Sequence, residues 1–211
     1  LHILQKGSHA MAAGNTIVFK LSPLACLSAY ALASLIEEAG FPAGVFNFIT
    51  GGGEAGRALI EHQDVDLVSF TGSTTTGRTV AASAGSTGKQ VYLELGGKAP
   101  ALVFNDADME AVSKDLAGAA FGSTGQSCTA ATRIYIEDGV YENFLKTFVE
   151  ATSHFRSGDP FSPESTMGPL ITMSARDRAL ALAVDAVERG ARLVFGDLSK
   201  GTVNEGGYFM N

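Results

Sequence analysis

The chain has 211 residues, enough for one large hydrophobic core or two smaller ones. Its 15 basic and 22 acidic residues leave a net charge of -7, and no run of Lys or Arg forms a basic stripe, which argues against nucleic acid as a partner. No apolar run approaches the roughly 20 residues that cross a bilayer, so a membrane segment is not expected. The two cysteines, Cys26 and Cys128, lack the spacing of a disulfide scaffold, and we expect a reducing, cytoplasmic setting.

The first half of the chain alternates short β-branched or aromatic runs with helical stretches. This alternation is typical of βαβ units around a parallel sheet. In chain order, the sequence predicts strand 16–21, helix 28–39, strand 45–50, helix 54–61, strand 67–71, a helix from the turn at 72–73 to about residue 84, and strand 91–95.

The second half restarts the same alternation after two glycines, Gly96 and Gly97, where we place a domain boundary. The predicted elements are a buried strand 101–104, helix 108–121 with Asp106 or Asp108 as its cap, strand 134–137, helix 141–155, helix 174–188 and strand 192–195. The expected fold class is therefore α/β, with two domains, residues 1–96 and 97–211, that share an interface. Because the chain starts in an apolar run and stops directly after an aromatic pair, we expect an internal piece of a longer protein.

Turns that carry Gly or Ser follow the strands of the first half, and such turns suit a phosphate because backbone amides and helix N-termini attract anions. Gly51, Gly53 and Gly56 have a spacing close to a dinucleotide fingerprint, but Glu54 lies where a phosphate would be repelled. These glycines fit two interpretations, a nucleotide-binding site or ordinary turns in which glycine supplies a positive φ. Lys20, at the end of the first strand, either contacts a ligand or extends into water.

Cys128 follows a predicted helix in a loop of small polar residues, unlike the apolar surroundings of most free cysteines. Such a position suits a reactive thiol, and the backbone amide of Cys128 itself could donate to an oxyanion. Cys26, between Ala25 and Leu27, fits a small buried hydrophobe instead.

Glu94 lies in an otherwise apolar strand, immediately before the two glycines. A buried carboxylate is unfavourable unless it is paired or used, and desolvation would make the carboxylate a stronger base, as the activation of water requires. The alternative is a structural ion pair of Glu94 with Lys98 or Lys89.

Five motifs, in this order, closely resemble the aldehyde dehydrogenase superfamily over essentially the whole chain. They are GNTIVFK at 14–20, FTGS at 70–73, ELGGK at 94–98, GQSC at 125–128 and MGPL at 167–170. The resemblance implies a Rossmann-like, nicotinamide cofactor-binding domain over 1–96 and an α/β catalytic domain over 97–211. It also implies NAD or NADP as cofactor, a small-molecule aldehyde as substrate and a homo-oligomer for the complete protein.

The roles that the resemblance implies centre on two catalytic residues. Cys128 would attack the aldehyde as a thiolate, and Glu94 would activate the water that hydrolyses the resulting thioester. The cofactor contacts that it implies are Lys20 and Ser22 at the adenosine ribose and phosphate, Gly53 and Gly56 beside the adenine, Gly72 and Ser73 near the pyrophosphate, and the Leu95 carbonyl at the nicotinamide amide.

This sequence departs from the family pattern at Pro23, where the family usually has a Glu that holds the ribose hydroxyls of NAD. Because a carboxylate there would repel a 2'-phosphate, its absence leaves the choice between NAD and NADP open. The family's asparagine oxyanion donor lies upstream of this chain, and its oligomerisation strand lies downstream. We therefore expect the 211 residues alone to be inactive.

Three rival functions remain. A coenzyme A-acylating dehydrogenase commonly lacks a carboxylate at the position of Glu94, and a non-catalytic relative has no need for both Cys128 and Glu94. A thiol hydrolase would need a histidine near the thiol, whereas His62 and His154 are expected at the surface. The sequence does not identify the aldehyde. Residues that could line part of the substrate tunnel are Phe121, Ser123, Thr124, Ser127 and Thr129. The small polar residues at 123, 124 and 127 argue against a bulky aromatic aldehyde.

Overall fold

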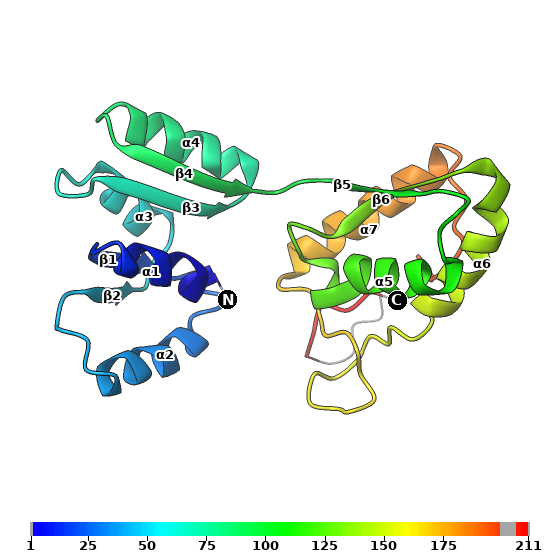
Figure 1. The fold of residues 1–211 in the computed structure, drawn as a ribbon, viewed down its shortest axis with the longest axis horizontal. Helices are drawn as coiled ribbons and strands as arrows, with labels where there is room; N and C mark the ends of the chain where they lie inside the picture. Colours follow the sequence, from blue (N-terminus) through cyan, green and yellow to red (C-terminus); the bar gives the residue numbers. More distant parts are fainter. Residues whose placement is uncertain (1, 199–205, 211) are drawn as a thin grey trace. The chain divides into compact units, whose positions relative to one another are not determined.

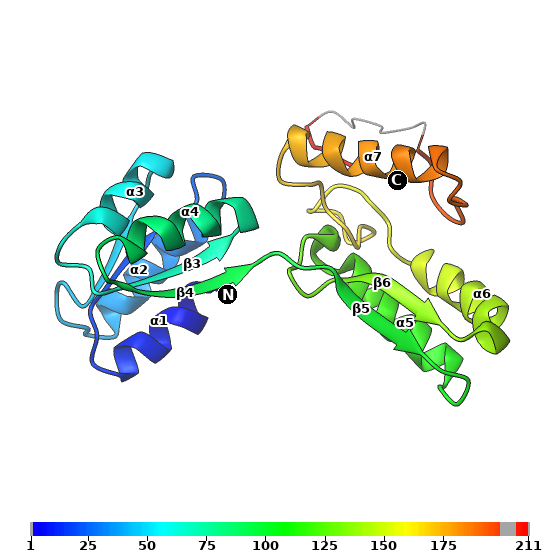
Figure 2. The ribbon, with the colours of Figure 1, turned by 90° about the horizontal axis from the view of Figure 1, so that it is seen from above.

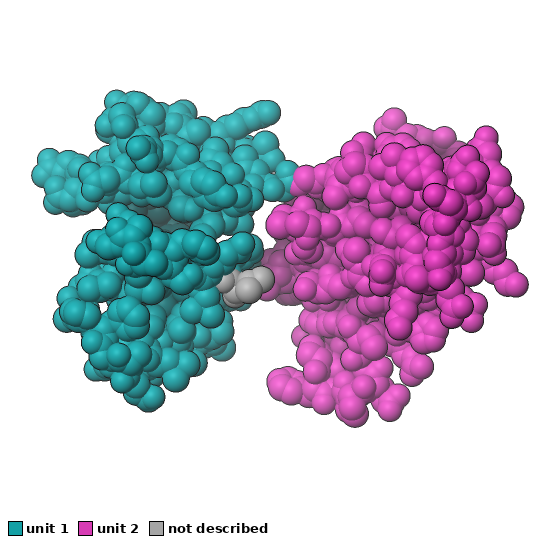
Figure 3. Space-filling view, in the orientation of Figure 1, with its two compact units in different colours: residues 1–96 teal, residues 97–211 magenta. Residues whose placement is uncertain are grey.

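The computed structural model describes residues 2–198 and 206–210, which form two compact units, Leu1–Gly96 and Gly97–Asn211 (Figures 1 and 3). Both units mix helices with parallel strands, which confirms the α/β fold class. The strands of the described residues pair two by two, in three separate sheets. Within these residues, no helix combines the length and the apolarity of a bilayer span.

Unit 1 contains four helices and four strands in its described part. In chain order they are α1 (His2–Ala12), β1 (Ile17–Lys20), α2 (Leu27–Glu38), β2 (Phe46–Ile49), α3 (Gly53–Glu61), β3 (Leu67–Gly72), α4 (Thr74–Gly85) and β4 (Gln90–Leu95). β1 pairs with β2 and β3 with β4, both in parallel (Figure 1). Each strand predicted for this half is present, with ends that differ by at most one residue.

One part of the core of unit 1 lies where α4 packs on β3 and β4. Val80 and Ala84 of α4 are buried there, and Gly77 is buried against the Leu95 side chain, which occupies the space that a Cβ would need. Helix α1 was not expected from the sequence. It is held by a tertiary contact, since Gly7 lies so close to the Phe46 ring that a Cβ would be 2.7 Å from Phe46 Cε2.

Unit 2 contains two strands and five helical segments in its described part. They are β5 (Ala99–Val103), α5 (Met109–Phe121), the 3-10 turn η1 (Gly122–Gly125), β6 (Ala131–Ile136), the 3-10 turn η2 (Asp138–Val140), α6 (Tyr141–Thr152) and α7 (Met173–Glu188). Figure 2 shows α5 and α6 beside the parallel pair of β5 and β6. Asp108 is the cap of α5, because its carboxylate accepts from the N–H groups of Glu110 and Ala111, each at 3.1 Å.

The core of unit 2 lies between α5 and α6. Phe144 of α6 is 2% exposed and Ala117 of α5 is 1% exposed. Ser113, also buried, places its hydroxyl 2.6 Å from the Thr147 hydroxyl, so the buried Ser113 hydroxyl has a hydrogen-bond partner on the neighbouring helix.

Two predictions for the second half are wrong. Strand 101–104 was expected to be buried, but β5 ends at Val103, and Leu102 and Phe104 are 62% and 57% exposed because only one face of the two-stranded sheet is covered. No strand forms at 192–195; this apolar run is irregular and largely exposed, and it has no partner strand among the described residues.

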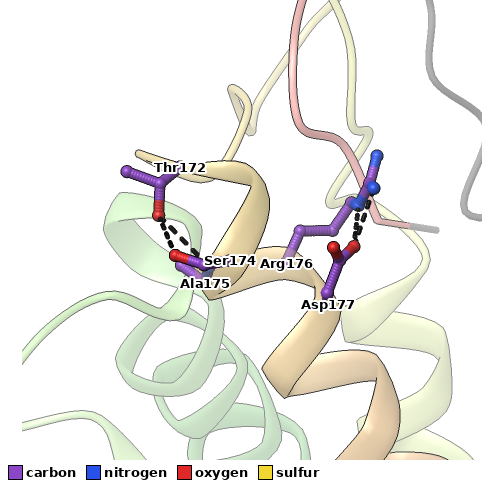
Figure 4. Close-up of polar contacts among 5 residues, drawn as sticks. All are labelled: Thr172, Ser174, Ala175, Arg176 and Asp177. Carbon is purple, nitrogen blue, oxygen red and sulfur yellow. Dashed lines mark hydrogen bonds and ion pairs between the residues drawn. The ribbon is translucent and has the colours of Figure 1, made fainter.

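The start of α7 is fixed by side chains (Figure 4). The Thr172 hydroxyl accepts from the Ala175 N–H at 3.1 Å and lies 3.1 Å from the Ser174 hydroxyl. Arg176, whose side chain is 12% exposed, forms an ion pair with Asp177 at 2.7 Å. The helix therefore starts at a defined point, directly after the segment 167–171.

Candidate active site

The loop that precedes Cys128 begins with a left-handed turn. After α5 ends at Phe121, Ser123 and Thr124 have φ angles of 54° and 59°, and Gly125 has a φ of 68°. The Gln126 N–H donates to the Ser123 carbonyl at 3.1 Å and closes the turn. Residues other than glycine disfavour this conformation by about 1–2 kcal/mol each, so other contacts must hold it.

Two side chains of this turn bind a segment more than forty residues away. The Thr124 hydroxyl donates to the Gly168 carbonyl at 3.3 Å, and the Gln126 side-chain oxygen accepts from the Ile171 N–H at 3.1 Å. We call this pair of contacts the loop clasp. It joins the segment 124–126 to the segment 168–171, which overlap the GQSC and MGPL motifs, and it contributes to stabilising the left-handed turn.

Cys128 is exposed at the end of this loop. Its neighbours Ser127 and Thr129 place their hydroxyls 3.0 Å apart, and the Thr129 N–H donates to the Ser127 hydroxyl at 3.3 Å. Within the described part of the chain, the Cys128 N–H donates to no protein acceptor, which leaves it available to an oxyanion. Gly97 lies beside this loop, since a Cβ on it would be 3.8 Å from the Cys128 carbonyl oxygen.

The other cysteine has a different environment. Cys26 occupies the N-cap position of α2 without a side-chain capping bond, and it is half-buried, with its sulfur 3.9 Å from the Pro23 carbonyl oxygen. It is thus less enclosed than the buried hydrophobe that the sequence indicated.

Glu94 is exposed on β4, so the expectation of a buried carboxylate is wrong for this chain. The strand alternates, and Glu94 lies on its open side together with Tyr92. The predicted ion pairs are also absent from the described residues, since Lys98 donates to the Gly97 carbonyl and Lys89 to the Thr87 hydroxyl.

Tyr92 is the hydrogen-bond partner of Glu94. Its hydroxyl donates to Glu94 Oε1 at 2.8 Å, and this bond, reinforced by the charge of the carboxylate, raises the pKa of Tyr92. Lys6 of α1 places its Nζ 5.9 Å from the centre of the Tyr92 ring. Burial lowers the pKa of Lys6, and the negative charge of Glu94 opposes that effect.

The pairing of β3 with β4 brings two predicted groups of cofactor residues to one edge. Thr71 is opposite Glu94 and Gly72 is opposite Leu95. Gly72 lies close to the Phe70 ring, since a Cβ on it would be 2.6 Å from Phe70 Cζ. Ser73 then caps α4: its hydroxyl accepts from the Thr76 N–H at 3.2 Å and donates to the Thr76 hydroxyl at 2.9 Å.

The pairing of β1 with β2 brings the other predicted cofactor residues together. The Lys20 ammonium donates to the Gly51 carbonyl at 3.1 Å, and a Cβ on Gly56 would be 3.9 Å from Lys20 Cδ. Gly53 is the first residue of α3, whose N-terminal amides carry the partial positive charge that favours an anion. Ser22 is exposed just after the strand, and its hydroxyl accepts from the Leu24 N–H at 3.3 Å.

Sequence reasoning did not single out Tyr92, Lys6 or the two residues of the loop clasp, Thr124 and Gln126, as positioning groups. The period of two along a strand could have indicated Tyr92, because it precedes Glu94 by two residues on the same face. No sequence signal announces the clasp, since it depends on where residues 168–171 fold.

His62 and His154 are exposed, as expected, and His154 Nδ1 lies 3.0 Å from the Glu150 carbonyl oxygen. Among the described residues, no group of three or more His, Cys, Asp or Glu side chains is arranged to hold a metal ion.

Comparisons with known proteins agree with these motifs. The sequence model of the aldehyde dehydrogenase family matches residues 1–211. Betaine aldehyde dehydrogenase from Brucella ovis is 43% identical over 191 residues, which cover 90% of this chain and 39% of that protein.

Two solved structures illustrate the likeness of fold. One is a mutant of aldehyde dehydrogenase C from Pseudomonas syringae in complex with NAD+ and octanal. Its TM-score is 0.90 at 35% identity, and the match covers 97% of this chain and 42% of the aldehyde dehydrogenase C chain. The other is an NADP-dependent enzyme from E. coli. Its TM-score is 0.93 at 41% identity, and the match covers 99% of this chain and 43% of the E. coli chain. The chain spans about two fifths of the length of these relatives. It belongs to the aldehyde dehydrogenase family.

Proposed function

We propose that the complete protein oxidises an aldehyde to a carboxylic acid with NAD+ or NADP+, with Cys128 as nucleophile and Glu94 as general base. The observation that carries the proposal is the state of Cys128: an exposed thiol on a clasped loop, with its own N–H uncommitted. A thiol that serves only packing would be expected in an apolar pocket instead.

The first half of the reaction takes place on Cys128. Its thiolate attacks the aldehyde carbon, and the carbonyl oxygen becomes an oxyanion, which the Cys128 N–H can stabilise. When bound, the oxidised nicotinamide supplies the hydride acceptor. Loss of hydride from the thiohemiacetal carbon leaves a thioester on Cys128.

The second half is hydrolysis of the thioester. Glu94 takes a proton from water, the water oxygen adds to the thioester carbon, and the acid leaves as the thiolate is restored. The sequence supports Glu94 in this role, because Glu94 is the carboxylate of the ELGGK motif.

The residues of unit 1 suit a dinucleotide. Lys20 offers an ammonium beside the α3 N-terminus with Gly53 and Gly56, and Gly72 and Ser73 open α4 next to Leu95. Ser22 adds an exposed hydroxyl at the end of β1. Backbone amides at such helix starts attract phosphates.

The choice of cofactor remains within the pair NAD and NADP. Pro23 brings no carboxylate that would repel a 2'-phosphate, and the relatives include both an NAD+ complex and an NADP-dependent enzyme. Parallel assays of the complete protein with both cofactors and a panel of aldehydes, including betaine aldehyde and octanal, will assign the preference.

Two variants of the complete protein test the mechanism. Cys128→Ser should abolish hydride transfer, because a neutral hydroxyl is a far weaker nucleophile than a thiolate. Glu94→Gln should leave a burst of NADH or NADPH and slow the steady state, because acylation precedes the step that needs the base. A Glu94→Gln enzyme with a normal steady-state rate would contradict this role, and a coenzyme A ester as product would identify the acylating rival.

A further inference from the structure

We infer that Tyr92 is a positioning residue for Glu94, which it holds by its phenolic hydroxyl in the orientation used for thioester hydrolysis. The inference rests on the proposed function, since it assigns a supporting role for the proposed base. Tyr92 touches neither the thiol nor a cofactor in this proposal, so it acts through Glu94 alone.

The geometry that carries the inference is local to β4. Residues two apart on a strand point to the same face, so Tyr92 and Glu94 project side by side. The phenolic oxygen lies 2.8 Å from Glu94 Oε1, a normal length for a hydroxyl that donates to a carboxylate. The backbone of the strand therefore fixes donor and acceptor relative to each other.

The surroundings of Glu94 make this bond important. Glu94 is exposed, so no close packing restricts its three side-chain torsions. Across the sheet its partner is Thr71, and for Glu94 no ion pair within 4.0 Å is present among the described residues. The Tyr92 hydroxyl is thus the group that fixes one carboxylate oxygen and leaves the other free to accept a proton from water.

Lys6 supports the Tyr92 side of the pair. Its ammonium lies 5.9 Å from the centre of the Tyr92 ring, within the range of a cation–π contact. The ring therefore has a partner on α1, while its hydroxyl is directed at Glu94.

If Tyr92 served only the folding of the protein, the effect of Tyr92→Phe would be a loss of folding stability. Tyr92 is 56% exposed, so water can replace the hydroxyl contact with little change in folding stability. A deficit confined to hydrolysis, with folding and aldehyde binding unchanged, would indicate positioning.

The kinetic test uses Tyr92→Phe in the complete protein. The burst of reduced cofactor and the aldehyde KM of acylation should stay unchanged, while the rate of hydrolysis should fall about 3- to 10-fold, the range set by loss of one hydrogen bond. In a Glu94→Gln background, Tyr92→Phe should cause no further fall, because the two residues act as one unit.

Tyr135→Phe is the matched control. Tyr135 is 55% exposed on β6, and its hydroxyl accepts from Arg133 at 3.3 Å rather than contacting a carboxylate. The Tyr135→Phe variant should hydrolyse the thioester at the same rate as the parent protein.

A spectroscopic measurement tests the bond without catalysis. In protein labelled with 13C-tyrosine, the resonance that Tyr92→Phe removes should titrate at a pKa above that of free tyrosine, and Glu94→Gln should lower that pKa. A resonance that titrates identically with and without the carboxylate would overturn the inference.

The outcomes separate this inference from the proposed function. If Glu94→Gln slows hydrolysis but Tyr92→Phe does not, the positioning role is wrong and the base assignment stands. If Glu94→Gln has a normal rate, the base assignment itself is wrong, whatever Tyr92→Phe does.

Discussion

The hydrogen bond of Thr124 in the loop clasp predicts how three substitutions at this position change folding stability. Thr124→Val keeps the branched shape and the unfavourable left-handed φ of 59°, but it removes the hydroxyl that donates to the Gly168 carbonyl at 3.3 Å. The lost hydrogen bond should reduce the free energy of unfolding by about 1 kcal/mol. The remaining strain of about 1–2 kcal/mol then opposes the native turn without that bond.

Two further substitutions at the same position separate bond from strain. Thr124→Ser keeps the hydroxyl and removes the branch, so its stability should match that of the parent within about 0.5 kcal/mol. Thr124→Gly relieves about 1–2 kcal/mol of strain, loses about 1 kcal/mol of hydrogen bond and gains unfolded-state freedom, so these effects should nearly cancel.

The assays are denaturant unfolding and the rate at which iodoacetamide alkylates Cys128, in a Cys26→Ala background so that one thiol reports. Thr124→Val should change the alkylation rate and Thr124→Ser should restore it. Thr79→Val is the control, since that hydroxyl bonds to the Thr75 carbonyl of its own helix. Equal stability and equal thiol reactivity of Thr124→Val and the parent would refute the proposed coupling of the clasp to the thiol.

Three further predictions concern stability and pH. Phe144→Ala, at a side chain 2% exposed between α5 and α6, should destabilise the protein by about 3–5 kcal/mol in denaturant unfolding. Asp108→Ala should reduce stability by about 1 kcal/mol through loss of the α5 cap, while Asp106→Ala, which caps nothing in the structure, should change it little. Because the pKa of Tyr92 is raised in the folded protein, its protonated hydroxyl contributes to folding stability. This contribution is complete below the unfolded pKa of about 10 and is lost as pH rises through the folded pKa. The stability of Tyr92→Phe should therefore depend less on alkaline pH than that of the parent.

Local signals predicted most of the fold. Strand runs bounded by glycine or proline gave β1 to β4 nearly to the residue, and the choice between Asp106 and Asp108 was open only because both precede a helix of the same pattern. Helix α1 escaped prediction because a contact of Gly7 with Phe46, far along the chain, stabilises it rather than its own propensity.

The errors concern burial and partners, which sequence patterns do not specify. The apolar run 192–195 has the composition of a strand but lacks a strand to pair with among the described residues. Glu94 was expected to be buried because its neighbours are apolar. Burial alternates along β4, however, and Glu94 lies on the exposed side of the strand. The motifs indicated Cys128 and Glu94 as candidates, whereas the contacts of Thr124, Gln126 and Tyr92 required coordinates.

The uncovered face of β5 and β6 affects how this chain behaves when it is produced by itself. Leu102 and Tyr135 are opposite each other in the register and are 62% and 55% exposed, with Phe104 just beyond. Parallel strands are normally covered on both faces, and an apolar surface of this kind promotes self-association as concentration rises. Polar replacements such as Leu102→Lys should therefore improve recovery from expression and delay precipitation, without altering the loop 122–128.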